Sequence, residues 1–350
     1  MAEHDRSAAG PVREAHRFDE AGLDAWMRAH VDGYAGPLSV RQFAGGQSNP
    51  TYRLSTPDRD YVLRRKPPGV LLKGAHAVER EYRLIAALHP TGFPVARPYG
   101  LCIEPEVIGT PFYVMEHVAG RNFWDTAFPE VAHADRPAYF DAMNDVIARL
   151  HAIDPAAVGL GDYGRPGNYF ERQIGRWSTQ YLDDTDAGRV AAMDALIEWL
   201  PANIPADDSS SIVHGDYRCD NLLFHPTEPR VLAVLDWELS TLGHPLADFA
   251  YHLMAWRMPP GFSTGLAGLD LKARNIPGEE DYVAAYCRRT GRDGIDHLDF
   301  YVAFSLFRLA AIIHGIKGRL IRGTASSPQA AEAVEQLDRI AELALVQTRR

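Results

Sequence analysis

The chain changes its pattern near residue 120, and this change constrains its fold more than any other feature. Strand-forming runs dominate the first part, whereas apolar residues at helical spacing dominate most of the rest. Residues 212–235 interrupt the helical part, because two short apolar runs flank a turn there in the manner of a β-hairpin. We therefore expect an α+β chain with a small sheet-containing N-terminal lobe and a mainly helical C-terminal lobe.

Approximate boundaries follow from this pattern. Residues 1–17 carry no sustained apolar period and are predicted to be a flexible N-terminal tail. Residues 18–118 would form the N-terminal lobe, and residues 119–350 the C-terminal lobe. The strands expected in the first lobe cover 38–43, 51–54, 61–63 and 113–118, and its helices begin after Asp19 and cover 75–88. The helices expected in the second lobe cover 137–151, 169–181, 191–200, 281–289, 298–317 and 327–346.

Charge and cysteine content narrow the class of protein. The chain has 36 Lys and Arg against 46 Asp and Glu, a net charge of -10, which argues against nucleic acid or an anionic membrane as a partner. Its three cysteines, Cys102, Cys219 and Cys287, are far apart, which argues against a disulfide framework or a zinc cluster. The first 20 residues lack the apolar stretch of a secretory signal. We expect a cytoplasmic location.

Residues 213–221 carry the strongest chemical signal, with the sequence V-H-G-D-Y-R-C-D-N. Asp216 stands five residues before Asn221, directly ahead of the predicted hairpin. In phosphoryl transfer an Asp accepts or orients the proton of the acceptor hydroxyl while a nearby Asn binds a metal, and a loop of this length brings both to one phosphate. The sequence predicts Asp216 as the catalytic residue and Asn221 as a metal ligand.

A second carboxylate follows the hairpin. The run V-L-D-W-E at 234–238 ends an apolar strand at Asp236, where a second metal ligand could reach the same site. One carboxylate and one amide oxygen, completed by waters and phosphates, suit Mg²⁺. Asp236 is therefore the predicted partner of Asn221 at a magnesium ion.

These motifs resemble those of the aminoglycoside phosphotransferase-like branch of the protein-kinase-like fold, over nearly the whole chain. The chain is most similar to the kinase-like domain found at the N-terminus of certain large acyl-CoA dehydrogenases, a hydroxyacyl-CoA kinase type. This similarity lies in L-R-R-K-P-P-G at 63–69 with A-H-A-V-E-R-E-Y at 75–82, N-Y-F-E-R-Q-I at 168–174 and W-E-L-S-T-L-G at 237–243. The resemblance implies a bilobal protein-kinase-like fold, with ATP bound by the N-terminal lobe and Mg²⁺ required.

Several ATP-binding residues are implied by the resemblance. The turn that contains Gly45, Gly46, Ser48 and Asn49 would cover phosphates, because glycines allow close approach and free N–H groups bond phosphate oxygens. The end of the strand 113–118 would be the hinge that recognises adenine through its backbone, at Glu116 and Val118. His214 and Asp248 would support the catalytic loop.

The cation that grips the α and β phosphates is left open between two residues. The third strand offers Arg64 where the family usually has Lys, and Lys66 lies on the same strand face. The glutamate that holds this cation is Glu81, with Glu79 as the alternative, because residues two apart on a helix do not share a face.

The sequence predicts an ATP- and Mg²⁺-dependent small-molecule kinase that phosphorylates an acceptor hydroxyl. The resemblance implies a hydroxyacyl-CoA as acceptor, and an acyl-CoA dehydrogenase as a partner in the same pathway. Arg172 and Arg176 are candidates for binding the acceptor's phosphate charges. Two alternatives stay open: a phosphotransferase for aminoglycosides or another small molecule, and a catalytically silent module that binds nucleotide or acyl-CoA.

Overall fold

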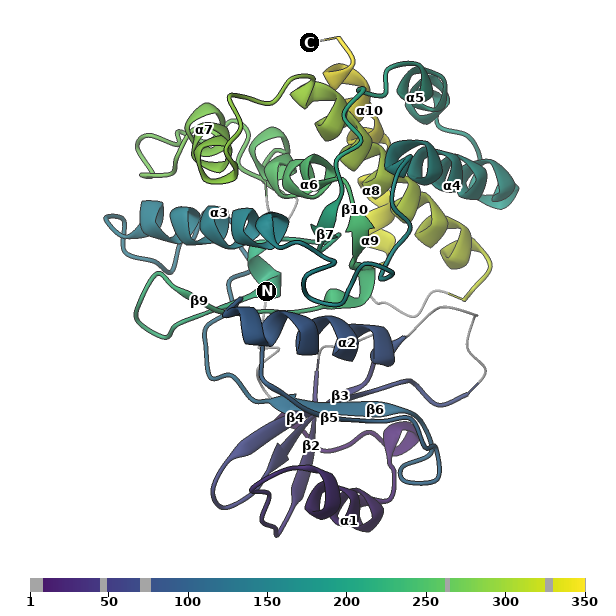
Figure 1. Cartoon of the computed structure of the whole chain (residues 1–350). Helices are drawn as coiled ribbons and strands as arrows, with labels where there is room; N and C mark the ends of the chain where they lie inside the picture. The colour runs from purple at the N-terminus through teal and green to yellow at the C-terminus, as the bar shows by residue number, and fades with distance from the viewer. Residues whose placement is uncertain (1–8, 45–48, 70–76, 262–264, 325–329, 350) are drawn as a thin grey trace. The chain divides into compact units, whose positions relative to one another are not determined.

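The computed structural model describes residues 9–44, 49–69, 77–261, 265–324 and 330–349 (Figure 1). The chain divides into two compact units, which confirms the bilobal α+β prediction. Unit 1 comprises residues 1–121 and 222–239, and unit 2 comprises residues 122–221 and 240–350. The hairpin thus belongs to unit 1 and not, as the predicted boundary at 118 has it, to the C-terminal lobe.

Backbone hydrogen bonds explain why the hairpin joins unit 1. Arg121 and Phe224 bond through both of their backbone N–H groups, at 2.7 and 2.8 Å. At the other strand, the N–H of Val234 donates to the carbonyl of Pro94 at 2.8 Å. These long-range bonds depend on the path of the whole chain and leave no local sequence signature. The hairpin strands are β8 (Leu222–Phe224) and β9 (Val231–Val234).

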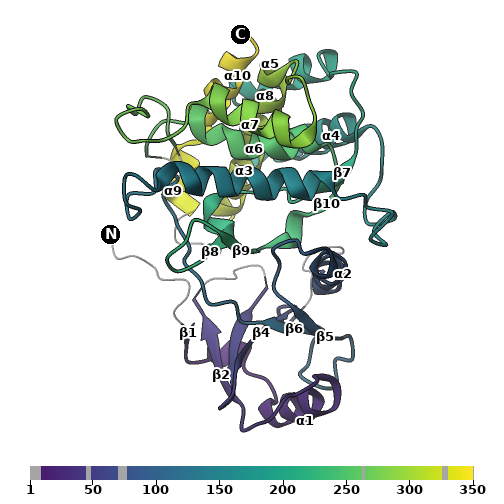
Figure 2. The same cartoon turned by 60° about the vertical axis from the view of Figure 1, so that its left-hand side comes forward.

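The sheet of unit 1 has six strands in the order β1-β2-β3-β4-β6-β5, and each neighbouring pair is antiparallel (Figure 2). The strands predicted at 38–43, 51–54 and 61–63 are confirmed as β2, β3 and β4, which pair consecutively. The sixth strand, β5, contains Pro and Gly, and its register shifts between Pro98 and Gly100. The strands are β1 (Ala9–Gly10), β2 (Ser39–Phe43), β3 (Thr51–Ser55), β4 (Asp60–Arg65), β5 (Pro98–Cys102) and β6 (Phe112–Glu116).

The two helices of unit 1 pack against successive residues of strand β4. Helix α1 (Glu20–His30) starts at Asp19, whose side chain accepts from the N–H groups of Ala21 and Gly22, and packs in one core with Leu63 of β4. Helix α2 (Val78–Leu88) contacts the side chain of the next residue along β4, Arg64. Successive side chains of a strand point to opposite faces. The β4 face that bears Arg64 is thus the face next to α2.

Residues 9–17 take part in unit 1, although they were predicted to belong to a flexible tail. Ala9 and Gly10 pair with Phe43 and Gln42 as the edge strand β1. The backbone N–H of Arg13 donates to Gln42 Oε1 at 3.0 Å. A two-residue strand buries little and has no detectable period, so it cannot be predicted from local pattern.

Unit 2 is built around α8, which packs against helices α4, α5, α6 and α10. Its sequence is apolar on nearly all sides, as expected of a helix surrounded by others. By length and composition it is the one described helix that could cross a membrane, and 78% of its most apolar window is buried within the fold. The helices are α3 (Arg136–Ala152), α4 (Tyr169–Asp183), α5 (Ala191–Ala202), α6 (Pro245–Arg257), α7 (Glu279–Thr290), α8 (Leu298–Ile321), α9 (Ala330–Glu335) and α10 (Leu337–Gln347).

A two-stranded antiparallel sheet completes unit 2. It joins β7 (Ser211–Val213) to β10 (Thr241–Gly243). β7 leads into His214 and Asp216, and β10 leads into α6 and Asp248. This pairing places the segment that leads into Asp216 next to the segment that leads into Asp248.

Candidate active site

In unit 1, the central feature is the guanidinium of Arg64. Its Nε lies 2.9 Å from Glu81 Oε2, and the two side chains are only 11% and 3% exposed. A second nitrogen donates to Asp236 Oδ1 at 2.8 Å and lies 3.7 Å from Glu238 Oε2. Burial opposes the charge of an arginine, but the attraction of Glu81 and the other acidic groups outweighs it and raises the pKa of Arg64. Arg64 is therefore a fixed positive charge.

Two further polar groups hold Glu81 in place. Asn49 Nδ2 donates to Glu81 Oε1 at 2.9 Å, and the hydroxyl of Tyr113 donates to Oε2 at 3.1 Å. Burial raises the pKa of Tyr113 well above its ordinary value, with the charge of Glu81 adding to the effect, so this hydroxyl keeps its proton. A carboxylate bonded this way can orient Arg64 without moving itself.

Lys66 and Glu79, the alternatives to Arg64 and Glu81, form a separate ion pair. Lys66 Nζ lies 2.7 Å from Glu79 Oε1, and the side chains are 22% and 42% exposed. Both pairs thus link the end of β4 to α2, but only Arg64 also contacts Asp236. The buried pair is better placed to grip a phosphate at a fixed position, because exposed pairs are flexible and weak.

Asp236 follows β9 and has a left-handed backbone, with φ 63°. Such a conformation is uncommon outside glycine and marks a constrained residue, although Asp and Asn tolerate it better than other residues. The next residue, Trp237, is buried and fixes the turn by donating its Nε1–H to the carbonyl of Val234 at 3.0 Å. The turn presents the Asp236 carboxylate beside Arg64.

In unit 2, the loop after β7 brings Asp216 and Asn221 together. Asn221 Nδ2 donates to the carbonyl of Asp216 at 2.9 Å and to its Oδ2 at 3.1 Å. The loop turns at Gly215, where φ is 84°, and the N–H of Asp216 donates to His214 Nδ1 at 3.2 Å. Since the Asn221 amide N–H₂ group serves the loop, its Oδ1 is the atom left to act as a ligand.

Asp248 anchors this loop from the first turn of α6. Its carboxylate accepts from the backbone N–H groups of His214 and Gly215 at 2.7 and 2.8 Å, and from His151 Nε2 at 3.2 Å. Burial alone would raise the pKa of Asp248, but the hydrogen bond and charge of His151 and the contacts with His214 lower it. The backbone of the loop is therefore held by the ionised carboxylate of Asp248, which accepts three hydrogen bonds. The role of His214 and Asp248 as supports of a catalytic loop stays a prediction.

Arg218 is a site residue that the sequence analysis does not single out, although it lies inside the motif. Its Nε is 3.3 Å from Asp216 Oδ1, and another nitrogen donates to Asp220 Oδ2 at 2.8 Å. Burial opposes its charge, but Asp220 and Asp216 outweigh that effect and raise the pKa of Arg218. A fixed cation beside the candidate catalytic carboxylate is suited to contacting an incoming phosphoryl group.

The remaining predicted residues are placed as follows. Gly45, Gly46 and Ser48 lie outside the described residues. Glu116 ends β6, where its backbone N–H donates to the carbonyl of Arg97, and Val118 follows in an irregular segment. On α4, one Arg172 nitrogen donates to the carbonyl of Arg165 at 2.5 Å, and Arg176 lies over the ring of Trp177.

The donor set fits Mg²⁺ in its chemistry. Asn221 offers an amide oxygen, and Asp236 offers a carboxylate. Mg²⁺ usually takes one or two such protein ligands and completes its shell with waters and substrate phosphates. Among the described residues, no group of three or more His, Cys, Asp and Glu could hold a metal by itself.

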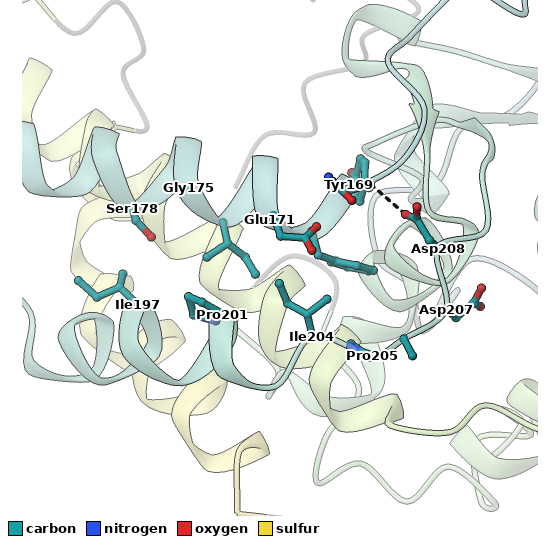
Figure 3. Close-up of a pocket in the computed structure, with 14 residues that line it drawn as sticks. Tyr169, Glu171, Gly175, Ser178, Ile197, Pro201, Ile204, Pro205, Asp207 and Asp208 are labelled. Atoms are coloured by element: carbon teal, nitrogen blue, oxygen red, sulfur yellow. Dashed lines mark hydrogen bonds between the residues drawn. The ribbon is translucent and has the colours of Figure 1, made fainter.

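A hollow of unit 2 lies between α4, α5 and the segment that precedes β7 (Figure 3). Its volume is about 660 Å³, and apolar side chains such as Ile174, Ile197 and Ile204 line it. Two carboxylates, Asp207 and Asp208, lie at one end of it, and Glu171 lies nearer its middle. Asp208 is engaged there, because it accepts from the backbone N–H of Asn168 at 3.0 Å. The hollow contains neither Asp216 nor Asn221.

Known proteins resemble this chain in sequence and in fold. Residues 39–301 match the sequence model of the family described as phosphotransferase enzyme family, APH. A solved structure from Ralstonia eutropha, provisionally named an aminoglycoside phosphotransferase, is 54% identical, with a TM-score of 0.89 over 95% of this chain and 99% of that one. A spectinomycin phosphotransferase solved with ADP and spectinomycin shares the fold at 13% identity, with a TM-score of 0.64 over 95% of this chain and 99% of that one.

A curated relative points to a larger context. Acyl-CoA dehydrogenase family member 10 of Mus musculus is 42% identical to this chain over 337 residues, which is 95% of this chain. The chain spans only 31% of the length of that relative. The similarity therefore concerns one part of a longer protein.

Proposed function

Because the chain belongs to the phosphotransferase enzyme family, we propose that it is a kinase that transfers the γ-phosphoryl group of ATP to a hydroxyl of a small molecule. The observation that carries the proposal is the loop of unit 2, in which Asn221 bonds Asp216 and Asp248 anchors the backbone. This arrangement holds a carboxylate ready to accept a hydroxyl proton.

Each residue has a role in the proposal. Asp216 orients the acceptor hydroxyl and takes its proton, and Arg218 offsets negative charge on the phosphoryl group. Arg64, oriented by Glu81, grips the nucleotide phosphates, with backbone groups at Glu116 and Val118 meeting adenine. Mg²⁺, when bound through Asn221 and Asp236, neutralises phosphate charge.

The hairpin supports the joint action of Asn221 and Asp236. Leu222 pairs with Val234 in the register of β8 and β9. Asn221 immediately precedes Leu222, and Asp236 follows Val234 by two residues. The pairing of the two strands therefore ties the two ligands to neighbouring chain segments.

The acceptor in this proposal is a hydroxyacyl-CoA. The support is the 42% identity to a member of the acyl-CoA dehydrogenase family. The reaction would turn a poor leaving group, hydroxide, into a phosphate, so that a dehydrogenase-type partner could process the hydroxylated chain. We extend the proposal to a cytoplasmic location, which suits the free, buried cysteines Cys102, Cys219 and Cys287.

The test is an ADP-release assay of the purified chain with ATP and Mg²⁺. The acceptors are 3-, 4- and 5-hydroxyacyl-CoAs, with kanamycin as the comparison and acyl-CoA without a hydroxyl as the blank. Phosphorylated hydroxyacyl-CoA, identified by mass, is the expected product. Phosphorylation of kanamycin alone would replace the acceptor with an aminoglycoside, and binding of ATP without transfer to any acceptor would favour a silent module.

A further inference from the structure

A buried arginine next to the catalytic loop has no part in the chemistry described so far. Arg308 lies in the middle of α8 and is 8% exposed. One of its nitrogens donates to the carbonyl of Gly215 at 2.7 Å, and Gly215 directly precedes Asp216. Its guanidinium also lies 5.2 Å from the centre of the Tyr251 ring, over its face. Arg308 therefore approaches the candidate base from the side of α8.

The charge of Arg308 is not matched by a carboxylate. Among the described residues, Arg308 forms no ion pair, whereas Arg64, Arg218 and Arg257 all do. Buried charges in proteins are normally paired, and an arginine has five N–H donors to satisfy. One of those five meets the Gly215 carbonyl. The site therefore offers positive charge and unused donors.

The surroundings do not supply the missing negative charge. The Asp248 carboxylate accepts three hydrogen bonds from the loop and His151, and Asp216 lies against Arg218 and Asn221. Burial raises the pKa of Tyr169, and Arg308 acts against that rise, so this ring lies within reach of its charge and stays neutral. None of the described protein groups supplies a carboxylate oxygen to Arg308, and no Arg308 nitrogen is among the fully buried atoms without a partner, so an oxygen of a bound ligand can reach its remaining donors.

We propose that Arg308 binds an acyl oxygen of the acceptor, a thioester carbonyl or a carboxylate, a few carbons from the hydroxyl that Asp216 serves. This inference rests on the proposed function and adds a specificity-determining residue to it. Arg308 holds the acceptor through N–H···O bonds and takes no proton. Its positive charge also disfavours polycationic acceptors at this position.

Matched acceptors test this role. The first is a 4-hydroxyacyl-CoA, the second is its thioether analogue, which lacks only the carbonyl oxygen, and the third is the free 4-hydroxy fatty acid. For Arg308→Gln, kcat/KM should fall about 10- to 100-fold for an acceptor whose acyl oxygen is bound, which is the effect of losing a charged hydrogen bond. The loss should be less than about threefold for the thioether, and KM for ATP should not change.

Controls separate binding from support of the loop. Arg319→Gln removes an exposed arginine of the same helix and should leave all three acceptors unaffected. An equal loss for all acceptors in Arg308→Gln would overturn the inference and make Arg308 a loop support through Gly215. A loss confined to the thioester or to the carboxylate identifies the source of the oxygen.

A second measurement needs no variant and stands even if Arg308→Gln fails to fold. By calorimetry, the unaltered chain should bind an acyl-CoA more tightly than the matching S-alkyl-CoA. Equal affinities, together with a free fatty acid that binds no better than the alcohol of equal length, would overturn the inference. If the unaltered chain phosphorylates none of the acceptors but binds acyl-CoA with this preference, the proposed kinase reaction fails while the assignment of Arg308 survives.

Discussion

Arg64 contacts Glu81 and Asp236 at once, at 2.9 and 2.8 Å, so one buried cation joins α2 to the second residue after β9. The same guanidinium is thus oriented by one carboxylate and lies beside a predicted metal ligand. Glu81 is fixed in turn by Asn49 and Tyr113. A phosphate bound to Arg64 would therefore also lie near the Asp236 carboxylate.

The first prediction concerns this cation. Arg64→Ala should raise KM for ATP by about 10-fold or more, because it removes a charged hydrogen-bond donor from the phosphates. Steady-state kinetics at saturating acceptor measures this. Lys66→Ala is the matched control, since it breaks the more exposed pair with Glu79 and should change KM for ATP by less than about twofold. The reverse order of effects would make Lys66 the phosphate-gripping residue.

Asp236→Asn should weaken binding of Mg-ATP by removing a full negative charge from a site with few protein ligands. Asn is the right replacement because it tolerates the left-handed backbone at this position, where φ is 63°. Calorimetric titration should show a lower affinity that higher Mg²⁺ partly restores, and excess EDTA should abolish the difference between variant and parent. Unchanged affinity for Mg-ATP would exclude Asp236 as a ligand.

Asp216→Ala should lower kcat by about 10²- to 10⁴-fold, the usual effect of losing a general base, while ATP binding persists. Turnover and nucleotide affinity are measured on the same preparation. Asp58→Asn, in the exposed turn between β3 and β4, is the charge-matched control and should behave like the parent. Near-normal turnover in Asp216→Ala would remove the catalytic role from the loop.

Local sequence pattern predicted the strands β2 to β4, the hairpin and the loop of unit 2. Strands β2 to β4 are short β-type runs separated by turn residues, and Asp216 and Asn221 lie within one short motif, so chain spacing alone brings those two residues together. Strand β5 could not be found this way. It contains Pro and Gly, which disfavour strands, and it exists because β6 pairs with it.

The remaining residues around the loop of unit 2 lie there because of contacts between residues that are far apart in the chain. His151 supports Asp248 from 97 residues away, and Arg308 reaches Gly215 across 93. Neither stands near a motif, and nothing in its neighbours distinguishes it from a core or surface residue. Arg218 differs, because it lies inside the motif, and its two carboxylate neighbours in sequence were a usable signal.

The last prediction concerns stability against pH. His252 is buried in α6, bonded to the Tyr282 hydroxyl, and burial lowers its pKa to about 4. His252 therefore binds a proton near pH 6.5 in the unfolded chain but only near pH 4 in the folded chain. The free energy of unfolding consequently rises with pH across this window. Between pH 7 and pH 5 the free energy of unfolding should fall by about 2 kcal/mol from this group alone.

His252→Gln, which keeps a hydrogen-bonding group, should flatten but not abolish the slope measured by urea denaturation, because the pKa values of His117 and His244 are lowered as well. His89→Gln, at an exposed position, should keep the parent slope, and an unchanged slope in His252→Gln would show that this histidine is not the group that titrates on unfolding.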